Sequence, residues 1–189
     1  MSGPVLVLQT QTRGGIAVIR SLGEKGIPVV AADSDRLGVG LFSRYCSRRL
    51  VYPDPEVNKD AFSEFVLLEL ARHKYDLVVP MFDATLLPLA RKKAQVEGLT
   101  RFPFLDYESL MRGRDKAWTV AIARQCNVRV PATYTVDSEE QVESALESLE
   151  VPVIVRPRET SRSRGLRLVA RREDVPSAWR EVSGCFGPA

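Results

Sequence analysis

The chain has 189 residues, of which 44% are hydrophobic and 27% are charged, and its formal net charge at pH 7 is +3. This length and composition are those of a soluble globular protein with one large or two small domains, each with its own core. The slight net charge, with basic and acidic residues interleaved over most of the chain, argues against non-specific nucleic-acid binding. We therefore expect no nucleic-acid partner.

The cysteines and the apolar runs bear on the location of the protein. Cys46, Cys126 and Cys185 are far apart and lack CxxC spacing, which predicts a reduced, cytoplasmic protein without a metal cage. No apolar run approaches the roughly 20 residues that cross a bilayer, and the first residues lack the pattern of a secretion signal. His73 is the single histidine, so neither a histidine triad nor a histidine metal site is expected.

The first hundred residues alternate between predicted strands and helices. Short apolar runs predict strands, and apolar residues at helical spacing predict the helices between them. This order predicts an α/β fold with a Rossmann-like parallel sheet, covered on both faces, and ligands at the carboxyl ends of its strands. The predicted strands are 5–9, 27–32, 49–52, 75–81 and 102–105, and the helices are 16–25, 57–72 and 84–94, the last capped by Asp83.

A dinucleotide-binding domain is the alternative interpretation of this opening. Asp33 ends the second predicted strand, where a ribose-binding acid is found in such domains. The loop after the first strand, however, reads QTQTRGG and lacks the G-x-G-x-x-G pattern. An aspartate at a strand end is more often a turn or cap residue. A non-catalytic Rossmann-like module that binds a nucleotide or small ligand therefore stays the second hypothesis.

The rest of the chain predicts a small α+β domain. Gly113, after a short predicted helix, suggests a boundary, and we divide the chain into domains 1–110 and 111–189. Asp115 is placed to cap the helix 115–126, and Ser138 with Gln141 fits a capping box for a helix to Leu149. Further strands are predicted at 130–136 and from residue 151, and a last helix at 174–182.

The stretch from Val151 to Val169 reads as a strand, a charged loop and a second strand. A period of two puts Ile154 and Arg156 on one face of the first strand. Five arginines stand between residues 156 and 167, against the single acid Glu159. Such a loop can bind phosphate oxygens, although a charged hairpin is more often only a solvated turn. Lys116 favours the first interpretation, because the helix dipole disfavours a cation in the first turn of a helix.

The pair formed by "RDKAW" at residues 114–118 and "PVIVRPRE" at residues 152–159 resembles the ATP-grasp superfamily, in particular the branch that contains the large subunit of carbamoyl-phosphate synthase. The resemblance extends over nearly the whole chain. It implies that Lys116 and Arg156 contact ATP, and that the loop over the phosphates includes Ser161, Ser163, Arg164 and Gly165. Family loops carry several glycines, whereas this one has only Gly165. By the same resemblance Arg13, Asp33 and Asp83 face a substrate.

The resemblance also implies an activity. ATP-grasp ligases use ATP and magnesium to convert a small carboxylate into an acyl phosphate, which an amine or similar nucleophile then attacks to form a carbon–nitrogen bond. In the family the chain continues beyond this point into a larger subdomain that supplies the magnesium ligands. We therefore expect an amino-terminal portion that is inactive by itself, with no metal ligands of its own, and that self-associates through roughly residues 130–189.

Overall fold

A computed structural model describes residues 3–160 and 164–187, and Ser161 and Ser163 lie outside these residues. The chain divides into two compact units, Met1–Tyr107 and Glu108–Ala189. The sequence-based boundary is at residue 110.

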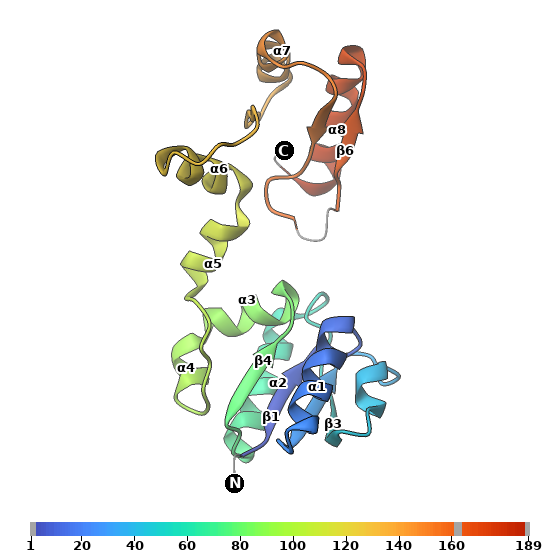
Figure 1. Ribbon diagram of the computed structural model, residues 1–189, viewed down its shortest axis with the longest axis vertical. Coiled ribbons are helices and arrows are strands. Elements are labelled where there is room, and N and C mark those ends of the chain that lie inside the picture. The colour runs from blue at the N-terminus through green and yellow to red at the C-terminus, as the bar shows by residue number, and fades with distance from the viewer. Residues whose placement is uncertain (1–2, 161–163, 188–189) are drawn as a thin grey trace. The chain divides into compact units, whose positions relative to one another are not determined.

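The first unit is built on a parallel sheet of four strands in the order β3-β2-β1-β4. The predicted α/β fold is confirmed. Figure 1 shows helices on both sides of these strands. The elements are β1 (Val5–Leu8), α1 (Arg13–Glu24), β2 (Val29–Asp33), η1 (Val39–Phe42), β3 (Cys46–Val51), α2 (Lys59–Arg72), β4 (Leu77–Pro80), α3 (Asp83–Arg91) and α4 (Lys93–Glu97).

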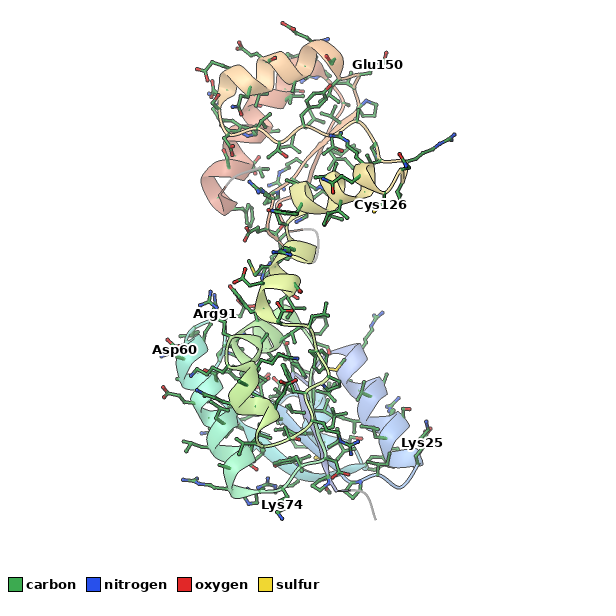
Figure 2. The ribbon with its side chains drawn as sticks, turned by 90° about the vertical axis from the view of Figure 1, so that its left-hand side faces the viewer. Lys25, Asp60, Lys74, Arg91, Cys126 and Glu150 are labelled. Carbon is green, nitrogen blue, oxygen red and sulfur yellow. The ribbon has the colours of Figure 1, made fainter. Side chains whose placement is uncertain are left out.

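Alternate residues of the central strands point to two separate hydrophobic clusters. Leu6 and Leu8 of β1 pack with Phe62 of α2 and with side chains of α3 and α4. Val5 and Val7 pack on the other face, with side chains of α1 and η1. In Figure 2 the strands lie between α2, which runs from near Asp60 towards Lys74, and α1, which ends at Lys25. Burial on both faces explains why β1 is apolar throughout.

The predicted strand at 102–105 is wrong. In the segment 101–105, only Arg101 forms a bridge with the edge strand β4, opposite Leu77. Pro103 has no N–H to donate, and the Phe104 N–H turns back to the carbonyl of Phe102 at 2.8 Å. The Phe102 side chain is buried in the core, so the apolar pattern at this position reflects packing and not strand pairing.

A charged cluster links β3, α2 and the residues before β4. The Arg48 guanidinium donates to the Glu69 carboxylate and to the Tyr75 hydroxyl, and Tyr75 Oη donates to Glu69 Oε1 at 2.5 Å. His73 Nδ1 lies 3.1 Å from the same oxygen. Burial works to raise the pKa of Glu69, but the hydrogen bonds from Tyr75 and Arg48 outweigh it and lower that pKa.

We expect this cluster to make the first unit less stable in acid. Because the folded state lowers the pKa of Glu69, the unfolded chain takes up the proton first. The contribution to stability is present above the ordinary glutamate pKa and is lost as pH falls through the folded value. Glu69→Gln should cost about 1–2 kcal/mol at neutral pH and flatten this loss. Urea unfolding followed by circular dichroism at several pH values measures the loss of stability at neutral pH and its dependence on pH. Glu64→Gln, at an exposed position of α2, is the control. Equal acid sensitivity of wild type and Glu69→Gln would contradict the prediction.

The second unit is a two-stranded antiparallel hairpin packed against helices. Its elements are α5 (Tyr107–Arg114), α6 (Lys116–Gln125), α7 (Glu139–Ser148), β5 (Val153–Val155), β6 (Arg167–Val169), η2 (Arg172–Asp174) and α8 (Val175–Phe186). Val142 and Leu146 of α7 and Val175 of α8 pack on Val169 of β6, with Val153 and Val155 against them. The Ser138 hydroxyl caps α7 by accepting from the Gln141 N–H at 3.4 Å, as predicted.

The predicted strand at 130–136 is wrong, since the structure assigns no strand to these residues. Pro131 cannot donate to a ladder, and Thr133 Oγ1 donates to the carbonyl of Pro131 at 2.9 Å. The strand predicted from Val151 is confirmed only at β5, where Val153–Val155 pairs with Arg167–Val169. Among the described residues no helix is long and apolar enough to cross a membrane.

Candidate functional site

Asp115 joins two parts of the second unit. As the N-cap of α6 it accepts from the backbone N–H of Ala117 at 2.9 Å and of Trp118 at 3.4 Å. The same carboxylate accepts from Arg158, with Nε at 2.9 and 3.0 Å from its two oxygens and one terminal nitrogen at 2.7 Å. Asp115 is only 6% exposed. The hydrogen bonds from Arg158 hold the pKa of Asp115 below its usual range, although burial acts in the opposite direction.

Lys116 follows the cap and binds the loop after β5. Its Nζ donates to the carbonyl oxygens of Arg158 at 3.0 Å and Thr160 at 2.9 Å, and its backbone N–H donates to the Arg158 carbonyl at 3.3 Å. Burial, and then the charges of Arg156 and Arg114, lower the pKa of the Lys116 ammonium. An ammonium has three N–H donors, so with two bonded to these carbonyls the third can meet a ligand.

The face of β5 that carries Arg156 is apolar and exposed. Val153 and Val155 point into the core, so Ile154 and Arg156 lie on the opposite face. Ile154 pairs with Leu168 of β6, and the two side chains are 57% and 68% exposed. A planar apolar group could rest on this pair while its charged part meets Arg156.

Gly165 ends the described part of the loop in a conformation that requires glycine. Its φ is +74°, and a Cβ at this position would lie 2.7 Å from the ring of Phe186 and from Cγ of Pro157. Arg164 is exposed, and its carbonyl accepts from Thr160 Oγ1 at 3.1 Å. Gly165 therefore shapes the hairpin.

Lys116, Arg156 and Arg158 also line one cavity of about 120 Å³. Its other walls are mainly apolar side chains of α7, α8 and β5. The indole nitrogen of Trp179, at this cavity, is buried and has no hydrogen-bond partner within the described chain. The three cations thus lie at the border of an apolar region, where charge interactions are stronger than in water.

Asp33 lies at the carboxyl end of β2 in the first unit and is fully buried. Its carboxylate accepts from the N–H of Gln11 at 2.8 Å and of Asp35 at 3.2 Å, and Thr10 Oγ1 lies 3.5 Å away. These bonds hold the loop after β1 against the loop after β2. Asp33 thus has the turn role that the sequence analysis weighed against the ribose role.

Arg13 and Asp83 each begin a helix after a strand. Arg13 is the first residue of α1, is exposed, and follows the N-cap Thr12, whose hydroxyl accepts from the Gly15 N–H at 3.1 Å. Asp83 is the first residue of α3 and has interactions within the structure. The N-cap is Phe82, so the prediction that Asp83 caps this helix is wrong by one position.

The sequence analysis missed the Asp115–Arg158 pair and the apolar walls beside Lys116. Arg158 is one of five arginines between residues 156 and 167, and nothing in its local pattern distinguishes it from the others. The signal that could have found it is the capping acid itself, because a buried carboxylate requires a partner. Among residues 3–160 and 164–187, no group of three or more His, Cys, Asp or Glu side chains could hold a metal ion.

One known protein is similar in sequence to part of this chain. No protein-family model matches the chain. A formate-dependent phosphoribosylglycinamide formyltransferase from Synechococcus sp. (strain CC9605) is 30% identical over 125 residues, which are 66% of this chain and 30% of the relative. The chain thus corresponds to less than a third of that relative's length.

Two solved structures are similar over almost the whole chain. L-amino acid ligase from Bacillus licheniformis has a TM-score of 0.71 at 19% identity, over 96% of this chain and 42% of the ligase. The biotin carboxylase domain of 2-oxoglutarate carboxylase from Hydrogenobacter thermophilus, in complex with MgADP, ADP and bicarbonate, has a TM-score of 0.67 at 20% identity, over 99% of this chain and 42% of the domain. At these identities the likeness establishes the fold.

Proposed function

We propose that this chain, which has the fold of the amino-terminal part of an ATP-grasp enzyme, binds the phosphates of ATP through Lys116 and Arg156 of its second unit. The observation that carries the proposal is that Lys116 and Arg156 line one cavity, next to Arg158, which is paired with Asp115. Arg156 contributes to the lowered pKa of Lys116, so the two charges repel each other when no anion is bound. A polyphosphate would convert this repulsion into two attractive contacts.

The rest of the nucleotide fits the outer face of the hairpin. Ile154 and Leu168 form an exposed apolar pair on the face that carries Arg156, and an adenine ring can cover them. Arg164 and Gly165, with Ser161 and Ser163 outside the described residues, form the loop proposed to close over the phosphates. Among the described residues no group of three or more His, Cys, Asp or Glu could hold a metal ion, and we propose that the magnesium ligands belong to a further subdomain.

The parent activity that we propose is an ATP-dependent carbon–nitrogen ligase acting on a small carboxylate through an acyl phosphate. The support is the formyltransferase relative and the likeness to a ligase and a carboxylase. In the first unit, we propose that Arg13, Asp33 and Asp83 contribute to binding the carboxylate substrate. Asp33 would act through the loop that it holds. Membership of the carbamoyl-phosphate synthase branch and a cytoplasmic location remain predictions.

The 189-residue chain alone is proposed to bind ATP without turning it over. The described residues offer no metal cluster, and phosphoryl transfer depends on charge neutralisation by metal ions. The exposed face around Ile154 and Leu168 would then also promote self-association. A strict monomer in light scattering at high concentration would contradict this last point.

Calorimetric titration with magnesium ATP, with NADH as a parallel ligand, tests the proposal. We expect weak ATP binding and no binding of NADH, because Asp33 is fully buried and its carboxylate already accepts two backbone N–H groups. Binding of NADH alone would overturn the proposal and favour the dinucleotide module. Release of ADP above background would overturn the claim of inactivity.

A further inference from the structure

We propose that Arg158 is a positioning residue for the nucleotide phosphates, because its ion pair with Asp115 fixes the start of the loop so that Lys116 and Arg156 converge. The proposal rests on the function proposed above. Arg158 also lines the cavity, but in this role neither Asp115 nor Arg158 needs to touch the nucleotide.

The contacts that lead from Asp115 to Lys116 form a closed arrangement. The Arg158 side chain binds the Asp115 carboxylate through three hydrogen bonds. The backbone carbonyl of the same arginine accepts from both the N–H and Nζ of Lys116. The Thr160 carbonyl accepts from Nζ as well. Arg158 therefore fixes the loop backbone, and the loop backbone fixes the direction of the Lys116 side chain.

This ion pair differs from another in the same unit. In the Arg158–Asp115 pair the side chains are 35% and 9% exposed, whereas in the Arg167–Glu181 pair they are 45% and 54% exposed. Exposed ion pairs contribute little and hold no single geometry. A bidentate pair around a buried carboxylate has a defined geometry, and breaking it leaves a buried charge without its partner.

The consequence for binding is pre-organisation. Two long cationic side chains lose rotamer freedom when they meet a ligand, and this loss weakens binding. Lys116 is held before any nucleotide arrives, in a position that keeps it partly buried and close to the charge of Arg156. The ion pair thus maintains an arrangement of like charges that would separate without it.

Asp115→Asn gives the sharpest test, because positioning and simple electrostatics predict opposite results. Asparagine keeps the N-cap but removes the charge that orients Arg158. If only net charge mattered, losing a carboxylate would strengthen ATP binding. We expect ATP affinity to fall about fivefold to tenfold. Glu181→Gln removes one carboxylate from the exposed Arg167 pair and should leave affinity within twofold or strengthen it.

A second measurement does not depend on nucleotide binding. Nuclear magnetic resonance of the side-chain Cε group follows the titration of Lys116. The Asp115 charge itself works to raise the Lys116 pKa, so its loss alone would lower that pKa further. We expect the pKa to move up towards its ordinary value, because the released side chain regains solvent and separates from Arg156. Arg158→Gln should have the same effect, and Arg158→Lys, which keeps the charge without the fork, a smaller one.

The outcomes separate the proposals. An unchanged or lowered Lys116 pKa in Asp115→Asn would overturn the positioning role, whatever the affinity. No ATP binding by the wild type, with the expected change in the Lys116 titration, would overturn the proposed function and leave the arrangement of the loop intact. If circular dichroism shows that Asp115→Asn does not fold, Arg158→Lys replaces it. An unchanged or lowered Lys116 pKa in Arg158→Lys, relative to the wild type, would then overturn the positioning role.

Discussion

Replacing both Lys116 and Arg156 by alanine is expected to weaken the binding of magnesium ATP by at least about a hundredfold. A hydrogen bond to a charged group contributes roughly 1.5–3 kcal/mol, and about 1.4 kcal/mol corresponds to a tenfold change in affinity. The losses in the two single variants should sum to more than the loss in the double variant. The reason is that bound phosphate relieves the repulsion between the two cations, and removing either cation forfeits this relief together with its own contact. Calorimetric titration of the four proteins measures both the total and the coupling.

A matched control separates this effect from a change in net charge. Arg171→Ala with Arg180→Ala also removes two positive charges from the second unit. Both arginines are exposed and pair with acids at the surface, Arg171 with Asp174 and Arg180 with Glu139. We expect less than a fivefold loss of affinity at physiological ionic strength, where exposed charges are screened. Equal losses in the two double variants would show that ATP responds only to net charge and would contradict the proposed site.

Gly40→Ala is expected to destabilise the first unit by about 2–3 kcal/mol, since overpacking a close contact costs on this scale. A Cβ at Gly40 would overlap the carbonyl oxygen of Thr10 and lie 2.8 Å from its carbonyl carbon. Thr10 is fully buried beside Asp33, so its backbone has little room to move. The added methyl group should therefore force apart the loops that Asp33 joins.

The chain provides both a control and a way to localise the effect. At Gly98 a Cβ would lie 3.5 Å from the nearest atoms, and the backbone is helical, so Gly98→Ala should be neutral or slightly stabilising. The two tryptophans, Trp118 and Trp179, are both in the second unit. We expect Gly40→Ala to shift the unfolding transition seen by hydrogen exchange of β1 amides while the tryptophan fluorescence transition stays unchanged. A variant as stable as wild type would contradict the close packing at Thr10.

The sequence predicted the parts of the fold that depend on local pattern. The apolar run of β1 and the helices α1 and α2 follow from periodicity, and the caps at Asp115 and Ser138 follow from residue type. The same local reasoning placed strands where proline prevents them, at Pro131 and Pro103. In both segments apolar residues alternate, but a backbone without an N–H cannot complete the ladder.

The sequence indicates which cations belong to the candidate site but not the ion pair that positions them. Lys116 and Arg156 were recognised by resemblance, and the structure places both at one cavity. The pair of Asp115 and Arg158 spans 43 residues. Such a distance carries no periodic signal, and five arginines compete for the role in the sequence. Asp33 shows the opposite case, because its position suggested a ligand contact while its bonds in the structure go to neighbouring backbone groups.

The double use of Asp115 couples two local unfolding events that would otherwise be independent. One carboxylate satisfies the first N–H groups of α6 and also binds the loop arginine. If the first turn of α6 frays, the loop loses its attachment, and if the loop detaches, the helix keeps a cap that lacks its charge partner. The amides of Ala117 and Trp118 should therefore exchange with solvent in step with the loop. A ligand that orders the loop would therefore slow the exchange of these two amides without having to contact Ala117 or Trp118.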